Sequence, residues 1–181
     1  MKDLKELFVE PYIFKGETAR KARSLIDQTI DGASETKIFN TVIELLMFAA
    51  IYGCYLNIKE EPFINNKQGD TLTIFQETIS NYRDELIYIY KSIMLYSYQN
   101  EPEKAIDRAF RTYRNPENKK IFDEYVHGGI SELYDKFFNS TEAKYESYLN
   151  VVKEIINDLQ VFDEDKPINF DESILKDIES W

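Results

Sequence analysis

The sequence contains few of the residue types from which disulfides, metal centres and nucleophilic active sites are built. Among its 181 residues there is one cysteine, Cys54, and one histidine, His127. An intrachain disulfide is therefore excluded, and no cysteine–histidine spacing typical of a zinc site is present. The sequence also lacks a P-loop, a GxGxxG motif and a nucleophile-elbow serine. We therefore expect no catalytic residue, no cofactor and no bound metal ion.

Long apolar runs are also missing. The longest, Leu45–Tyr52, lies within Thr36–Leu56 and falls well short of the ~20 residues that cross a bilayer. A helix that is apolar on every side has to be enclosed by other elements. We therefore predict that Thr36–Leu56 is the central helix of the core, with Cys54 buried, and we expect no membrane partner. The start of the chain, MKDLKELFVEPY, has no charged-then-apolar signal, which predicts a cytoplasmic protein.

The composition predicts an ordered globule, because 43% of the residues are hydrophobic and there are only 6 glycines and 5 prolines. We predict an all-α fold: a single compact domain of about seven helices over residues 1–162, followed by an acidic C-terminal tail or arm at 163–181. Apolar periodicity and helix-start signals predict helices at Lys2–Val9, Glu17–Ile30, Thr36–Leu56 (capped by Ser34 or Thr36), Asn81–Tyr98, Pro102–Tyr113, Pro116–His127 and Ile130–Phe138, and from a capping box at Asn139 and Glu142 to Leu159. Thr71–Phe75 is expected to be a brief extended piece.

The net charge of −11 disfavours nucleic acid as a partner, because a uniform negative field repels phosphate. Residues 141–181 contribute −7 of this charge, with 11 acidic and 4 basic residues, so the other 140 residues carry −4. Contact with DNA would therefore need a separate basic face.

Two groups of basic residues are candidates for such a face. They are Arg20, Lys21 and Arg23, and Arg108, Arg111, Arg114, Lys119 and Lys120. If they lie together, they form a nucleic-acid-binding patch that faces phosphates. The alternative is that they lie on ordinary solvated faces, paired with acidic neighbours such as Glu17, Glu103, Asp107 and Glu117.

Three other features allow a structural or a functional interpretation. Glu44 precedes the apolar run and is either a buried acid with a raised pKa or a residue on the exposed edge of the helix or in an ion pair. Gly128-Gly129 predicts a tight turn between two helices. This turn is either architectural or a partner-binding site through its free backbone N–H groups. Trp181, the only tryptophan, is a further candidate for partner binding.

Three segments in order resemble the DNA phosphorothioation (Dnd) system-associated protein 4 family. They are FNTVIELLMFAAIYGCYLN, DELIYIYKSIMLYSY and IFDEYVHGGISELYDKF, and the resemblance covers about Phe14–Leu159. Where the family reads Ala-Asn before the paired glycines, this chain has Val126-His127. The resemblance implies a bacterial cytoplasmic protein of anti-phage defence islands and an accessory role, with no established catalytic residues to transfer.

These observations lead to two main functional hypotheses. The first is a non-enzymatic accessory component of a DNA-modification-linked defence system, with other defence-system proteins as partners and duplex DNA as a secondary one. The second is an acidic helical inhibitor or immunity-type protein that binds a nuclease or another DNA-binding partner. A Mg²⁺-dependent nuclease has less support, because no DxD-like or ExK pairing stands in a strand context. Exposed aromatic residues near Tyr96–Tyr98 or at Trp181 would suit a homo-oligomer as well.

Overall fold

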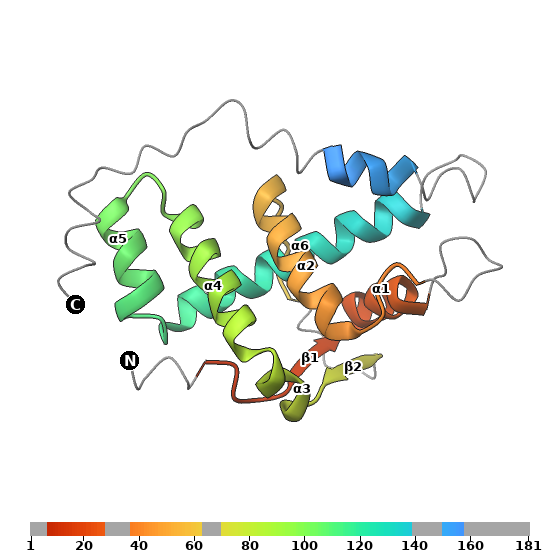
Figure 1. The fold of residues 1–181 in the computed structure, drawn as a ribbon, viewed down its shortest axis with the longest axis horizontal. Helices are drawn as coiled ribbons and strands as arrows, with labels where there is room; N and C mark the ends of the chain where they lie inside the picture. The colour runs from red at the N-terminus through yellow and green to blue at the C-terminus, as the bar shows by residue number, and fades with distance from the viewer. Residues whose placement is uncertain (1–6, 28–36, 63–69, 139–149, 158–181) are drawn as a thin grey trace.

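Helix α6 (Pro116–Phe138) runs the length of the molecule behind the other elements (Figure 1). The computed structural model describes residues 7–27, 37–62, 70–138 and 150–157. The other elements are β1 (Tyr12–Lys15), α1 (Gly16–Asp27), α2 (Val42–Leu56), β2 (Thr71–Ile74), α3 (Gln76–Asn81), α4 (Arg83–Ser97), α5 (Pro102–Ile106) and the π-helical turn η2 (Asp107–Arg111). Residues 150–157 are also helical. The predicted all-α class is confirmed.

The central helix α2 begins six residues later than predicted, because its start is set by a different capping signal. Thr41 accepts a hydrogen bond from the backbone N–H of Glu44, and the Glu44 carboxylate accepts from the backbone N–H groups of Thr41 and Asn40. This reciprocal arrangement is a capping box. The helix ends at Leu56 and is capped by Asn57, which adopts a left-handed conformation with φ of 54°. Glu44 is therefore a half-exposed cap of the helix and not a buried acid.

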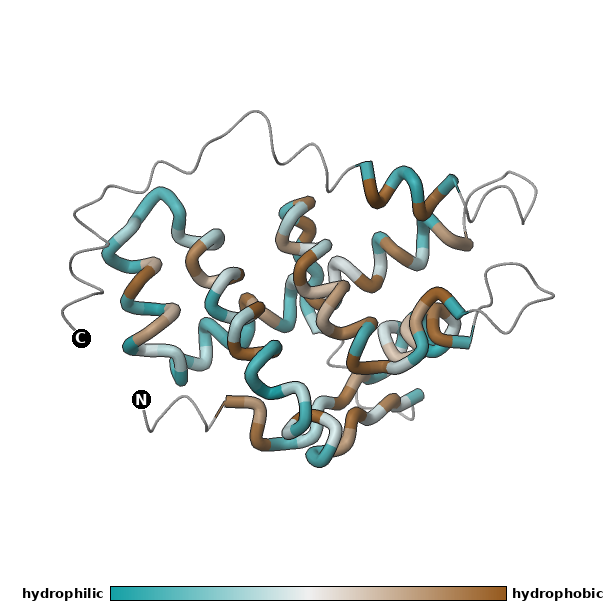
Figure 2. The backbone as a smooth tube through the Cα atoms, viewed as in Figure 1, coloured by the Kyte–Doolittle hydropathy of each residue, from teal (hydrophilic) through white to brown (hydrophobic). Residues whose placement is uncertain are grey.

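Helices α2 and α6 cross at very short distance, and glycines make this possible. A Cβ atom at Gly129 would overlap the backbone of Ala49, and one at Gly53 would overlap the backbone of Tyr125. A Cβ atom at Gly128 would overlap the carbonyl of Ile58, just past the end of α2. The crossing is surrounded by fully buried apolar side chains, and hydrophobic residues occur along much of α2 (Figure 2).

The predicted turn at Gly128-Gly129 is wrong, because α6 continues through both glycines without a break. A glycine inside a helix costs about 1 kcal/mol relative to alanine. Here that cost is offset by the close packing on α2, which a larger residue would prevent. Both glycines are buried, so they present no turn to a partner. The sequence signal for a turn was in fact a signal for a close helix crossing.

A two-stranded sheet closes one side of the helical core. β2 confirms the extended piece predicted at Thr71–Phe75, and it pairs antiparallel with β1, with Tyr12 opposite Ile74. The sequence did not identify β1 as a strand. Phe14 and Ile74 point into the core, whereas Ile13 on the other face is 46% exposed.

The remaining predicted helices agree with the structure in part. Helix α4 confirms the prediction at Asn81–Tyr98, and α1 confirms the start of the helix predicted at Glu17–Ile30. The single helix predicted at Pro102–Tyr113 is divided into α5 and η2. Most of Lys2–Val9, the capping box at Asn139 and Glu142, and the boundary at residue 163 lie outside the described residues, as does Trp181.

Candidate functional site

The two predicted groups of basic residues lie toward opposite ends of α6. Lys21 of α1 contacts Ser131 in the C-terminal half of α6, whereas Arg108 of η2 contacts Asn118 near its N-terminus. At 1.5 Å per residue, these two positions on α6 are about 20 Å apart. The groups therefore do not form the single continuous patch that one of the two interpretations required.

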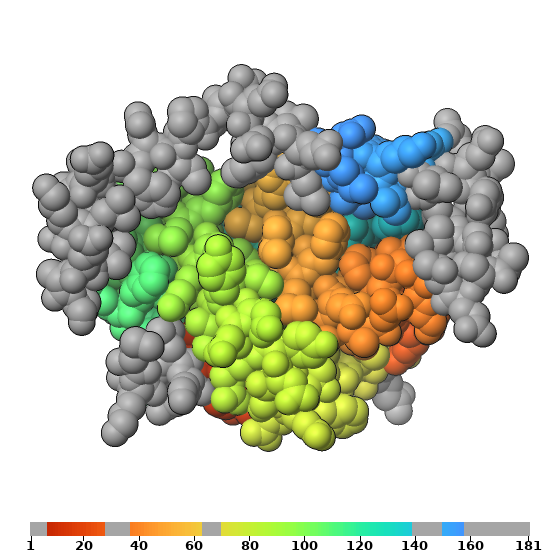
Figure 3. Space-filling view, viewed as in Figure 1, coloured from red at the N-terminus to blue at the C-terminus, as the bar shows by residue number. Residues whose placement is uncertain are grey.

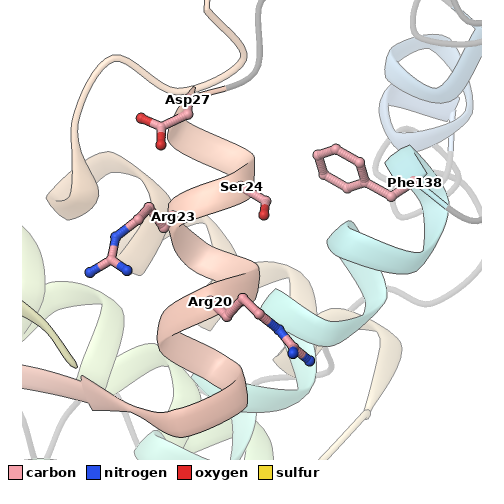
Figure 4. Close-up of a pocket in the computed structure, with 5 residues that line it drawn as sticks. All are labelled: Arg20, Arg23, Ser24, Asp27 and Phe138. Atoms are coloured by element: carbon pink, nitrogen blue, oxygen red, sulfur yellow. The ribbon is translucent and has the colours of Figure 1, made fainter. Parts of the chain in front are cut away.

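Two members of the group on α1, Arg20 and Arg23, line a shallow pocket of about 320 Å³. Its lining residues are Arg20, Arg23, Ser24, Asp27 and Phe138. The Phe138 ring faces α1 across the opening from Ser24, with Arg20 extending below them, while Arg23 and Asp27 point to the other side of α1 (Figure 4). On the side that faces Phe138 the lining combines the Arg20 guanidinium with a hydroxyl group and an aromatic ring, and this chemistry would suit a small anionic group.

Both arginines of this pocket already have acidic neighbours. Arg20 lies 3.5 Å from Glu17, and Arg23 lies 3.7 Å from Asp70 and donates a hydrogen bond to the carbonyl of Thr71 (2.9 Å). The Arg20 side chain is 67% exposed, so its ion pair contributes little to stability. Lys21 points inward and is part of a separate polar cluster.

That polar cluster joins α1, α6 and the segment after α2. Lys21 Nζ donates to Ser131 Oγ (2.9 Å), and Ser131 Oγ donates to Glu60 Oε2 (2.5 Å). The Lys21 ammonium also lies 5.8 Å from the centre of the Tyr134 ring. Ser131 is only 5% exposed, so this cluster links three segments of the fold and presents little surface to a ligand.

The second group is built around η2. Asn118 is fully buried, and its side-chain amide donates to the carbonyls of Arg108 (3.1 Å) and Thr112 (3.2 Å). Arg108 in turn donates to Asn118 Oδ1 (3.2 Å) and pairs with Glu117 (2.8 Å). These bonds satisfy carbonyl groups at the end of the π-helical turn and draw Arg108 inward, where its side chain is 16% exposed. Arg108 therefore has a structural role, because its guanidinium group bonds to Asn118 and Glu117.

Arg111 and Arg114 are exposed on the outside of this region. Beside them Phe110 is 43% exposed, and Lys91 Nζ of α4 lies 4.9 Å from the centre of its ring. An exposed aromatic ring among cationic groups can contact an anionic partner that also carries apolar groups. Nothing in the local sequence predicted the π-helical turn or the role of Lys91.

Lys119 and Lys120 lie on the first turns of α6 and are paired. Lys119 bonds to Asp123 (2.6 Å), and Lys120 lies 3.4 Å from both Glu61 and Glu124. Hydrogen bonds to these two carboxylates raise the pKa of Lys120. A shallow pocket of about 330 Å³ lies beside both lysines.

Most basic residues of the two groups therefore have acidic partners within the protein. The ion pairs predicted with Glu17 and Glu117 are confirmed. These carboxylates reduce the positive potential that a phosphate backbone would meet.

The residues best suited to acid–base or nucleophilic chemistry are buried. His127 is 6% exposed, and its Nδ1 lies 3.0 Å from Thr18 Oγ1. Burial lowers the pKa of His127, although Asp123 and Glu60 oppose this shift. Burial raises the pKa of the Cys54 thiol to about 12, which keeps it protonated at neutral pH and confirms its interpretation as a buried apolar residue.

Asp123 connects the polar face of α6 to β1. It accepts a hydrogen bond from the Tyr12 hydroxyl (2.9 Å) as well as the bond from Lys119. Burial, together with the nearby Asp123 charge, raises the pKa of Tyr12 well above its usual value. Tyr12 and Asp123 are 111 positions apart in the sequence, so no local spacing could have predicted this contact.

The described ranges lack both a metal-binding cluster and a membrane-spanning helix. Over residues 7–27, 37–62, 70–138 and 150–157, no three His, Cys, Asp or Glu side chains are grouped so that they could hold a metal ion. Over the same ranges, no helix combines the length and the apolar character needed to span a membrane.

Comparison with known proteins supports the resemblance found in the sequence. The family described as DNA sulphur modification system-associated protein 4 matches residues 17–169, which is most of the chain. No curated protein and no solved structure matches it.

Proposed function

The chain belongs to the DNA sulphur modification system-associated protein 4 family, and we propose that it is a non-enzymatic accessory component of such a system in anti-phage defence. In this proposal it acts through contacts with the other proteins of the system. The family is associated with a DNA sulphur modification system.

The observation that carries the proposal is the exposure of large apolar side chains. Tyr88 on α4 is 73% exposed, Phe75 before α3 is 71% exposed and Ile51 on α2 is 47% exposed. Helices α2 and α4 pack together and share one face of the molecule (Figure 3). Exposed aromatic residues are typical of protein–protein interfaces. A protein partner therefore explains these exposed apolar side chains better than DNA does.

Co-purification with the modification proteins tests the proposed contacts. We expect Tyr88→Ser combined with Phe75→Ser to abolish co-elution with co-expressed proteins of the system and to reduce protection against phage. Glu85→Ser, on an exposed position of the same helix α4, serves as the matched control and should change neither result. Unchanged co-elution of the folded double variant would contradict the assignment of this surface.

The burial of His127 and Cys54 supports the non-enzymatic part of the proposal. Neither group has the exposure and activated state that a general base or nucleophile needs. We expect His127→Asn and Cys54→Ala to retain defence activity in variants whose thermal melting shows a folded protein. Loss of defence in either folded variant would indicate a catalytic role.

Contact with duplex DNA is a second candidate, favoured by Arg111 and Arg114. Because the described basic groups are separated and largely matched by carboxylates, we expect binding weaker than micromolar at physiological salt. Titration of duplex DNA with and without phosphorothioate, from low to physiological salt, tests this expectation. Tight binding with a steep salt slope would indicate many phosphate contacts and would make DNA the main partner.

A further inference from the structure

The end of the molecule around η2 has a local excess of positive charge. Residues 91–120 include seven basic and four acidic residues, in a protein whose net charge is −11. We use the name η2 corner for Lys91, Phe110, Arg111 and Arg114. Phe110 and the two arginines are exposed, and the Lys91 ammonium lies over the Phe110 ring. The η2 corner therefore carries three cationic side chains, with Lys91 at the exposed Phe110 ring and Arg114 5.8 Å from the centre of the Tyr113 ring.

The rigid support of the η2 corner comes from residues that point inward. Asn118 holds the carbonyls of Arg108 and Thr112, and the Tyr90 hydroxyl donates to the carbonyl of Tyr113 (2.6 Å). These bonds hold the backbone on both sides of Arg111. A charged surface on a fixed backbone loses less conformational entropy when it binds a partner.

The last 24 residues of the same chain have complementary chemistry. Residues 158–181 contain eight acidic and two basic residues, and their aromatic residues are Phe162, Phe170 and Trp181. Carboxylates match the guanidinium groups of Arg111 and Arg114. Phe162, Phe170 and Trp181 match the exposed ring of Phe110.

The length of this segment is sufficient for it to reach the η2 corner. It follows the helical residues 150–157, which are tied to the C-terminal end of α6 by the ion pair between Glu154 and Lys136 (2.5 Å). The η2 turn is tied to the other end of α6 through Arg108 and Glu117. These two ties are about 30 Å apart along α6, whereas 24 residues span up to about 80 Å.

We propose that the η2 corner binds the acidic residues 158–181 of its own chain. The contact is intramolecular, so its high effective concentration favours it over a separate anionic partner of equal affinity. DNA or an acidic protein that uses Arg111 and Arg114 has to displace this segment. The surface is then available only to partners that compete successfully with the protein's own carboxylates. This inference does not depend on the partners proposed above.

The only tryptophan, Trp181, reports on this contact in the full-length protein. We expect its steady-state fluorescence anisotropy to be high at 50 mM NaCl and to fall toward 1 M NaCl, because salt screens exposed charges. Arg111→Glu combined with Arg114→Glu should give, already at 50 mM NaCl, the low value that the unmodified chain reaches at 1 M. Far-UV circular dichroism checks that the variant is folded.

A charge-matched control separates local binding from the effect of net charge. Arg20→Glu combined with Arg23→Glu makes the same change at the other end of α6 and should retain the original salt curve. Introducing Asp163→Lys, Glu164→Lys and Asp165→Lys into the η2-corner variant should restore the high anisotropy. Phe162→Trp in a Trp181→Phe background repeats the measurement at the start of the segment. The proposal is overturned if, with both reporters, the two double-Glu variants give the same curve.

Discussion

The face of α6 that packs on α2 and the face that packs on α1 and β1 are held by different interactions. On the first face, Gly129 of α6 and Gly53 of α2 bring the two helical backbones into direct contact, and Gly128 packs directly on the carbonyl of Ile58 just past α2. On the second, Asp123, His127 and Ser131 bond to partners on other segments. These three residues recur every four positions, so they share one face of the helix. Packing on the α2 face therefore requires residues without a Cβ atom, whereas packing on the other face requires side chains that form particular hydrogen bonds.

The difference predicts how each face responds to substitution. A close backbone contact cannot accommodate even one methyl group without moving a helix. A hydrogen bond between side chains can be lost at a cost limited to one unsatisfied group. The α2–α6 face should therefore be the less tolerant of the two.

Gly129→Ala should have the largest effect on the free energy of unfolding. It should destabilise the protein, although helix propensity alone predicts that it stabilises α6. Propensity alone would stabilise the helix by about 1 kcal/mol, but the new Cβ atom would overlap the backbone of Ala49. We expect a net loss of about 3 kcal/mol in the free energy of unfolding, measured by urea denaturation. Glu132→Ala on the same helix should stay within about 0.5 kcal/mol of the unmodified chain. If Gly129→Ala were more stable than the unmodified chain, close backbone packing would not distinguish the α2 face of α6 from the polar face.

Thr18→Val should have an intermediate effect on the polar face. It removes the hydroxyl that bonds to His127 Nδ1 and leaves a buried ring nitrogen without this partner. The expected loss is about 2 kcal/mol in the free energy of unfolding. Thr73→Val, at a half-exposed position of β2, makes the same chemical change and should have little effect. Equal losses in the two variants would show that the Thr18–His127 bond does not contribute.

The pH dependence of stability should report on the same polar face. Because the pKa of His127 is lowered in the folded protein, the unfolded chain binds a proton more readily near pH 6. The stabilising contribution is therefore fully present above the unfolded pKa of about 6.5 and is lost as the pH falls through the folded pKa. The chain has no other histidine, so His127→Asn should flatten the dependence of the unfolding free energy on pH between 7 and 5.5. If the slope of the unfolding free energy against pH is unchanged in this variant, the pH dependence comes from groups other than His127.

Lys21→Met should have the smallest effect. It keeps most of the apolar stem and removes the bond to Ser131 Oγ, so we expect a loss of at most about 1 kcal/mol in the free energy of unfolding. Arg20→Met, one position earlier, removes the exposed ion pair with Glu17 and should leave the free energy of unfolding almost unchanged. If Arg20→Met lowered the free energy of unfolding more than Lys21→Met does, the exposed Arg20 would contribute more to stability than Lys21, which contradicts this prediction.

Local patterns in the sequence predicted those parts of the fold that depend on neighbouring residues. The apolar run at Leu45–Tyr52 predicted a buried central helix, and the extended character of Thr71–Phe75 predicted β2. The start of α2 was misplaced, because Ser34 and Thr36 resemble caps as much as Thr41 does. Only the reciprocal bonds of Thr41 and Glu44 distinguish the true helix start.

The candidate site was less predictable because its geometry depends on contacts between distant segments. The sequence named the basic residues and two of their carboxylate partners correctly. It contained no signal that α6 separates the two groups, since that follows from where α1 and η2 pack. The contacts of Tyr12 with Asp123 and of Thr18 with His127 join residues more than 100 positions apart, beyond the range of any helical or strand period.

The sequence by itself determined an acidic, mainly helical protein of a family associated with DNA sulphur modification, because composition, apolar period and segment order are properties of the chain. The tertiary structure alone decided what Gly128-Gly129 and the basic residues do. A glycine pair permits both a turn and a close helix crossing, and only the position of α2 selects between them. An arginine likewise suits a phosphate or a carboxylate, and only the fold places Glu117 beside Arg108.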